Sequence, residues 1–149
     1  MQVNQAIIAF SQSEKLKSGI IWASQIVEMY IGLSEPEKLG AERVLKTWIN
    51  MIATEIHVAK TAAPHDVWSD AEKDMNTALV MLNSGVTQEA GFHLTQALTK
   101  VTTIGQQSMT LLADKGLLYH STQLTSLKIF RLLQLRCLSR ASASISQFG

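Results

Sequence analysis

The sequence predicts an all-α fold: an antiparallel up-down bundle of four helices, followed by an additional C-terminal helix. Apolar residues recur at alternating steps of three and four along four long segments, which is the spacing of one helix face. Capping residues precede these segments, and no segment alternates between apolar and polar residues as a half-buried strand does. The 149 residues have the size of one domain, so we assign 1–116 to the bundle and 117–149 to an appended basic helix and tail.

The first helix is predicted to begin after Ser11 and to end near Gly32. Ser11 and Glu14 have the spacing of a capping box, in which a serine and an acid three residues later satisfy free amide groups of the first turn. Residues 1–10 are expected to form a separate turn or short helix. The inward face of the helix consists of Leu16, Ile20, Ala23, Val27 and Tyr30.

The second helix has the clearest start and end signals in the chain. Ser34 is a capping residue, Pro36 suits a first helical turn, and Glu35 and Glu37 complement the positive end of the helix dipole. Pro64 ends the helix because it removes a backbone donor and clashes with the preceding turn. Its inward face consists of Leu45, Ile49, Ile52, Ile56, Ala59 and Ala63.

The third and fourth helices are joined by a short turn at Asn83, Ser84 and Gly85. Ser69 and Glu72 repeat the capping-box spacing at the start of the third helix, and Thr87 is expected to cap the fourth, which closes at Gly116. Short connections of this kind favour antiparallel neighbours. The inward residues are Ala71, Met75, Ala78 and Leu82 in the third helix, and Ala90, Leu94, Ala97, Val101, Ile104, Ser108 and Leu111 in the fourth.

The segment after Asp114 differs in charge from the rest of the chain. Residues 1–114 contain 12 acidic and 8 basic residues, a net charge of −4, whereas residues 115–149 contain 5 basic residues and no acid. The opposite charges favour docking of a basic fifth helix on the bundle. One alternative is that this segment binds nucleic acid through Arg131 and Arg136, although few aromatic residues accompany its basic residues. Another is that a shifted reading frame produced the acid-free composition.

Composition points to the cytoplasm. Cys137 is the only cysteine of the sequence, so an intrachain disulfide is excluded and a reducing compartment is indicated. The first residues carry no positive charge before their apolar stretch, as a secretory signal would. No run of apolar residues is long enough to cross a bilayer, so we expect no membrane span.

One pair of residues suggests metal chemistry. Glu89 and His93 lie four positions apart on the predicted fourth helix and therefore share a face, which makes them candidate metal ligands or an acid–base pair. Di-iron bundles use Glu-x-x-His on two helices and a glutamate from each of the others, and that spacing is absent from the sequence. A metal-dependent enzyme with a site near this pair is kept as the alternative function.

Other catalytic signatures are missing from the sequence. There is no glycine-rich dinucleotide or phosphate loop, no G-x-S-x-G elbow and no H-E-x-x-H pair. We therefore predict no cofactor and no catalytic residue.

The outer face of the fourth helix is poor in charge. Between Met75 and Ala113 only Glu89 and Lys100 carry a full charge. Depletion of charge is a mark of protein interfaces, and threonine is a mediocre helix former whose presence requires another reason. The predicted interface residues on this helix are Thr95, Thr99, Thr102, Thr103 and Thr110.

The first helix is apolar on two sides. Ile21, Trp22 and Met29 each lie more than about 100° from the centre of its inward stripe. A helix that is apolar on both sides is buried on both sides. We therefore predict a non-enzymatic interaction protein of adaptor, chaperone-like or scaffold type. It is expected to form homo-oligomers, or to bind a helical partner, through its first and fourth helices. Binding of nucleic acid is not expected.

Overall fold

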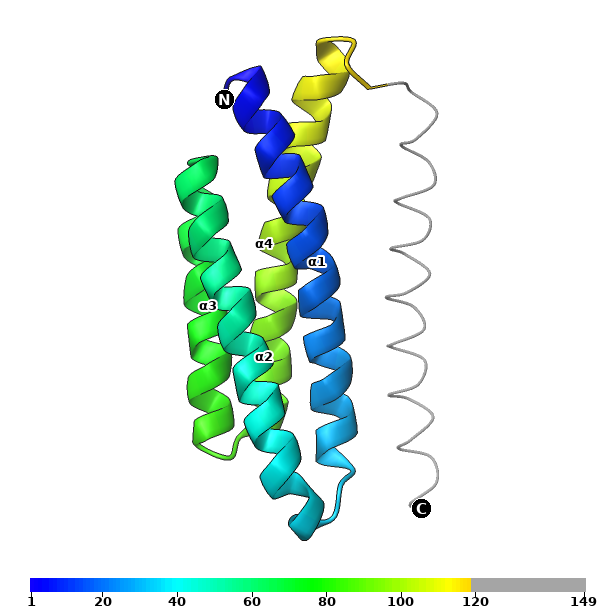
Figure 1. Ribbon diagram of the computed structural model, residues 1–149, viewed down its shortest axis with the longest axis vertical. Coiled ribbons are helices and arrows are strands. Elements are labelled where there is room, and N and C mark those ends of the chain that lie inside the picture. Colours follow the sequence, from blue (N-terminus) through cyan, green and yellow to red (C-terminus); the bar gives the residue numbers. More distant parts are fainter. Residues whose placement is uncertain (119–149) are drawn as a thin grey trace. The chain divides into compact units, whose positions relative to one another are not determined.

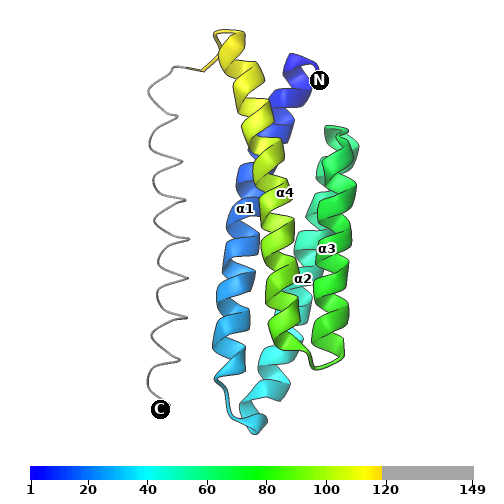
Figure 2. The same cartoon turned by 180° about the vertical axis from the view of Figure 1, so that it is seen from behind.

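The structure is a computed structural model that describes residues 1–118. It contains four helices packed against each other, and these residues contain no strand. Consecutive helices run in opposite directions in both views of the molecule (Figures 1 and 2). The all-α prediction is confirmed, whereas the predicted fifth helix and Cys137 lie outside the described residues. The helices are α1 (Val3–Ile31), α2 (Glu35–Ala62), α3 (Asp66–Asn83) and α4 (Thr87–Asp114).

The predicted start of α2 is confirmed. Ser34 precedes the helix with extended backbone angles, and its backbone N–H donates to Oε2 of Glu37 over 3.0 Å. Pro36 lies in the first turn, where its missing N–H costs no intrahelical hydrogen bond. The helix ends at Ala62, two residues before Pro64, as expected.

The predicted start of α1 at Ser11 is wrong, because the helix already begins at Val3. Gln2 is its N-cap, and the backbone N–H of Gln2 donates to the Gln5 side chain over 3.0 Å. Ala6 and Ala9 are fully buried, so the inward stripe of the helix extends upstream of Ser11. Residues 3–10 are therefore the first turns of one long helix and not a separate element.

The predicted start of α3 at Ser69 is also wrong. The helix begins at Asp66 because Nδ1 of His65 accepts a hydrogen bond from the backbone N–H of Val67 over 3.2 Å. This earlier start places Trp68 in the core, where its side chain is fully buried and its indole N–H donates to the carbonyl of Ala63 over 3.0 Å.

The core follows the predicted stripes with one displacement. Nearly all inward residues named above are buried, and Tyr30 packs against the core while remaining partly exposed. In the last turn of α4, Leu112 is buried and Leu111 is half-buried, the reverse of the prediction. A straight helix drifts relative to a fixed three–four pattern, so such an offset accumulates toward the end of a long helix.

Candidate interaction surface

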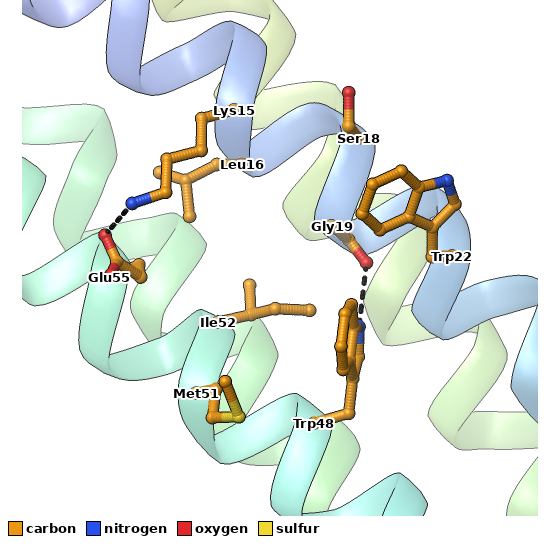
Figure 3. Close-up of a pocket in the computed structure, with 9 residues that line it drawn as sticks. All are labelled: Lys15, Leu16, Ser18, Gly19, Trp22, Trp48, Met51, Ile52 and Glu55. Carbon is orange, nitrogen blue, oxygen red and sulfur yellow. Dashed lines mark hydrogen bonds and ion pairs between the residues drawn. The ribbon is translucent and has the colours of Figure 1, made fainter.

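A hollow opens on the surface between α1 and α2. It has a volume of about 360 Å³ and apolar walls. Gly19 leaves space because it lacks a side chain, and Ile52 packs about 3.5 Å from the point that a Cβ at Gly19 would occupy. The residues around the hollow are shown in Figure 3: Lys15, Leu16, Ser18, Gly19, Trp22, Trp48, Met51, Ile52 and Glu55.

Two tryptophans form one end of the hollow. The ring centroids of Trp22 on α1 and Trp48 on α2 lie 6.1 Å apart, and the ring planes are tilted by 49°. The indole N–H of Trp48 donates to the carbonyl of Gly19 over 3.2 Å, which fixes that ring against α1 (Figure 3). Trp22 makes no such bond within the described residues, and 54% of it is exposed. Trp48 is thus fixed against α1 beside Trp22, whereas the Trp22 side chain is accessible from solvent.

An ion pair forms the other end of the hollow. Nζ of Lys15 on α1 lies 2.6 Å from Oε2 of Glu55 on α2 (Figure 3). Both side chains are well exposed, so water screens the pair and it adds little to the stability of the fold. Its clearer effect is to leave the hollow without net charge.

Exposed apolar side chains extend this surface along both helices. On α1 the exposed residues Ile8, Trp22 and Met29 lie on one heptad-spaced line that also includes Lys15. On α2 the exposed valines and methionine are spaced by seven as well. A spacing of seven keeps residues on one face of a helix. We call the following set the α1–α2 face: Ile8, Trp22 and Met29 with Val44, Met51 and Val58.

A second, shallower hollow continues this face along α2. It has a volume of about 350 Å³ and shares Trp48 and Met51 with the first hollow. Val44 and Thr47 lie on its rim together with Arg43. The two hollows therefore form one continuous uneven surface, with methionine and tryptophan side chains between them.

The interface residues predicted from sequence separate into two groups. Trp22 and Met29 are exposed on the α1–α2 face, and Met29 is 70% exposed. Ile21 is half-buried, and it lines neither hollow. The threonines lie on α4, away from both hollows: Thr95, Thr99 and Thr110 are exposed, whereas Thr102 and Thr103 are half-buried.

Four of the α4 threonines bind their own helix. The hydroxyls of Thr95, Thr99, Thr103 and Thr110 donate to the carbonyl four residues earlier, over distances of 2.9–3.1 Å. This back-bonding is the usual way in which threonine satisfies its hydroxyl inside a helix. The hydroxyl hydrogens of these four threonines are consequently engaged by their own helix and are not free to bind a ligand.

The candidate metal pair gains no support from its surroundings. Glu89 is exposed and His93 is half-buried, with its ring packed edge-on against Phe92 at 5.5 Å. The buried Nδ1 of His93 has no hydrogen-bond partner among residues 1–118. In the same range no three His, Cys, Asp or Glu side chains lie close enough to hold a metal ion together.

Three other charged contacts join α3 to neighbouring helices. Glu72 on α3 contacts two α2 residues, with Nζ of Lys60 at 3.1 Å and Nδ1 of His57 at 3.1 Å. The hydrogen bond from Lys60 is the main cause that lowers the pKa of the Glu72 carboxyl. Nζ of Lys100 on α4 lies 2.5 Å from Oδ2 of Asp74 on α3. These contacts tie α3 to α2 and α4.

Sequence reasoning missed most of the α1–α2 face. Trp22 and Met29 were predicted, but Val44, Met51 and Val58 were not, because the strong inward stripe of α2 dominates the apolar pattern of that helix. The signal that could have found them is their spacing of seven, which matches that of Lys15, Trp22 and Met29 on α1.

Within the described residues no helix has the length and apolar character needed to cross a membrane. Comparisons of the chain with protein-family models, curated proteins and solved structures gave no match. Function must therefore be inferred from the chemistry of the surface itself.

Proposed function

We propose that the chain is a non-enzymatic helical interaction protein that self-associates through the α1–α2 face. The observation that carries the proposal is the set of six large apolar side chains exposed together on two adjacent helices, 38–70% exposed for each residue. Large exposed apolar patches on a folded protein mark interaction sites, because removing them from water is favourable.

The hollow between Lys15 and Trp22 supports the same proposal. Interfaces are anchored by aromatic and methionine side chains that fit into pockets, and both residue types lie here beside a pocket. A catalytic role is not favoured, because the walls are apolar and the two charged groups are paired with each other. An adaptor, a scaffold or a chaperone-like protein, built as an up-down bundle and located in the cytoplasm, fits this chemistry.

Light scattering coupled to gel filtration tests the proposal on the full chain. The wild-type protein is expected to be a dimer or larger at micromolar concentration. Trp22→Glu places a charge in the centre of the face, and loss of a central tryptophan costs about 2 kcal/mol, or about 30-fold in the dissociation constant. We expect a monomer with an unchanged helical circular dichroism spectrum.

Val80→Glu is the matched control for this experiment. Val80 on α3 is 56% exposed, close to the value for Trp22, but it belongs to neither hollow. The control variant should keep the wild-type mass. A monomeric wild-type protein at this concentration, or equal dissociation by both variants, would contradict the proposal.

A further inference from the structure

We propose that the occupant of the α1–α2 face is the same face of a second copy, related by a two-fold axis parallel to the helices, so that α1 of each copy packs against α2 of the other. This inference rests on the proposed function and specifies its geometry. It follows from the relative heights of residues on the two helices, from the charges on the face, and from its size.

The contacts between α1 and α2 fix which residues lie at the same height. Lys15 pairs with Glu55, Trp22 with Trp48, and Gly19 packs beside Ile52. Because the helices are antiparallel and rise equally per residue, residue numbers at one height add up to about 70 along the whole pair. Positions 58, 51 and 44 of α2 are therefore level with about positions 12, 19 and 26 of α1.

The large exposed side chains of the two helices consequently alternate in height. On α1 they lie at Ile8, Lys15, Trp22 and Met29, and the heights of Val58, Met51 and Val44 fall between them. A two-fold axis along the helices preserves height and exchanges α1 with α2. Each side chain of the α2 row in one copy thus meets a gap of the α1 row in the other, as knobs meet holes in helix packing.

The central gap is the best formed of the three. It lies between Lys15 and Trp22, where the intervening residues are the small Ser18 and Gly19. Met51, 57% exposed, is the α2 residue at this height. In the proposed dimer the methionine of each copy enters the gap of the other, and an unbranched methionine adapts readily to such an irregular space.

The charges on the face agree with this orientation. With the axis along the helices, Lys15 of one copy faces Glu55 of the other, so each ion pair gains an opposite neighbour. An axis across the helices would instead place α1 on α1, and the alternation in height would no longer be guaranteed. The first hollow has no net charge, because its two charged lining residues, Lys15 and Glu55, pair with each other, and this suits a second copy better than a charged partner.

The size of the face is sufficient for a specific dimer. From Ile8 to Met29 it extends about 32 Å along the helix, at about 1.5 Å per residue. Two helices side by side are about 20 Å wide, so the face covers about 640 Å² per copy. The total of about 1,300 Å² exceeds the roughly 1,000 Å² that a biological interface requires.

Disulfide trapping between two differently tagged full-length chains tests the orientation. Both chains carry Cys137→Ser; one also carries Ser18→Cys and the other Met51→Cys. When the two are mixed, unfolded and refolded together, oxidation should give a covalent heterodimer, because the two Cβ atoms approach the roughly 4 Å that a disulfide needs. Each variant alone should stay non-covalent, and Val80→Cys in place of Ser18→Cys should give no heterodimer.

The outcomes separate this inference from the proposed function. A dimer by light scattering that gives no Ser18→Cys–Met51→Cys heterodimer overturns the orientation but leaves self-association intact. Efficient trapping of Met51→Cys with itself also overturns it, because that product requires α2 to pack on α2. A monomeric chain overturns both proposals.

Discussion

At the scale of single residues, one glycine determines how closely α4 approaches α1. A Cβ added at Gly105 would lie 2.6 Å from Oγ and 3.3 Å from Cβ of Ser13 on α1. The Ser13 hydroxyl is held in place by donating to the carbonyl of Phe10 over 2.8 Å, and Ser13 itself is buried. The α4 backbone at Gly105 therefore packs directly against the Ser13 side chain and leaves no room for a methyl group.

We predict that Gly105→Ala destabilises the fold. Alanine favours a helix over glycine by about 1 kcal/mol, but overpacking a buried contact costs about 1–3 kcal/mol, so the net loss should be up to about 2 kcal/mol. Urea unfolding followed by circular dichroism measures it. Gly40→Ala in α2, where a Cβ meets nothing within 4 Å, is the control and should be neutral or stabilising. Equal stability of the two variants would show that the α1–α4 contact can relax.

At the scale of the helices, the start of α2 is the best-defined boundary. The backbone N–H and the hydroxyl of Ser34 both donate to the Glu37 carboxylate, at 3.0 Å and 2.5 Å. These bonds, the hydroxyl first, lower the pKa of Glu37. Because Ser34 and Glu37 are both exposed, these hydrogen bonds, and not packing of the two side chains in the core, fix the first turn.

Ser34→Ala should lower the free energy of unfolding by about 1 kcal/mol, the usual cost of losing an N-cap side chain. Ser69 provides the matched control, since it has the same capping-box spacing in the sequence but lies inside α3. Ser69→Ala should be neutral or slightly stabilising because alanine is the better helix former. Thermal unfolding of both variants decides the matter, and a larger loss for Ser69→Ala would contradict this assignment.

The same comparison explains which helix boundaries could be predicted. A capping-box spacing marks a helix start only where the preceding residues are not helical. The residues before Ser11 and before Ser69 are helical, so neither spacing marks a start. Before Ser11 the buried alanines Ala6 and Ala9 favour continuation, and before Ser69 the helix is capped by His65, which is not among the favoured capping residues. The inward stripes were predictable because burial of one face repeats every three to four residues.

The candidate surface was predictable only in part. Trp22 and Met29 could be recognised because they are large apolar residues opposite a clear core stripe. The α2 residues could be recognised from their spacing of seven, but that they lie beside the α1 residues depends on the pairing of the two helices, through contacts such as that between Trp48 and the Gly19 carbonyl. A single helix pattern contains no information about which outer face lies beside which.

At the scale of the whole molecule, α3 is tied to the others by charge as well as by the core. Glu72 contacts Lys60 and His57 of α2, and its side chain is only 24% exposed. Its pKa in the folded protein is lower than the ordinary value of 4.5. The stabilisation from this carboxylate is therefore complete above the unfolded-state pKa and is lost as the pH falls through the folded-state pKa.

We predict that Glu72→Gln lowers the free energy of unfolding by about 1 kcal/mol at pH 7 and by less at pH 3. Urea titrations of the wild type and the variant at both pH values measure the difference. Glu28→Gln is the control, since Glu28 is exposed and forms no ion pair within residues 1–118. A Glu72→Gln effect that is equal at the two pH values would indicate lost packing instead of lost charge.

The threonine row of α4 has a consequence for hydration. The hydroxyls of Thr95, Thr99 and Thr103 donate their hydrogens to backbone carbonyls of α4. Water bound to this row therefore mainly donates to the hydroxyl oxygens, and these threonines need no water to accept their hydroxyl hydrogens. Removing these threonine side chains from water costs much less free energy than removing lysine and glutamate side chains. This side of α4 can therefore border either water or another surface at a small cost in free energy.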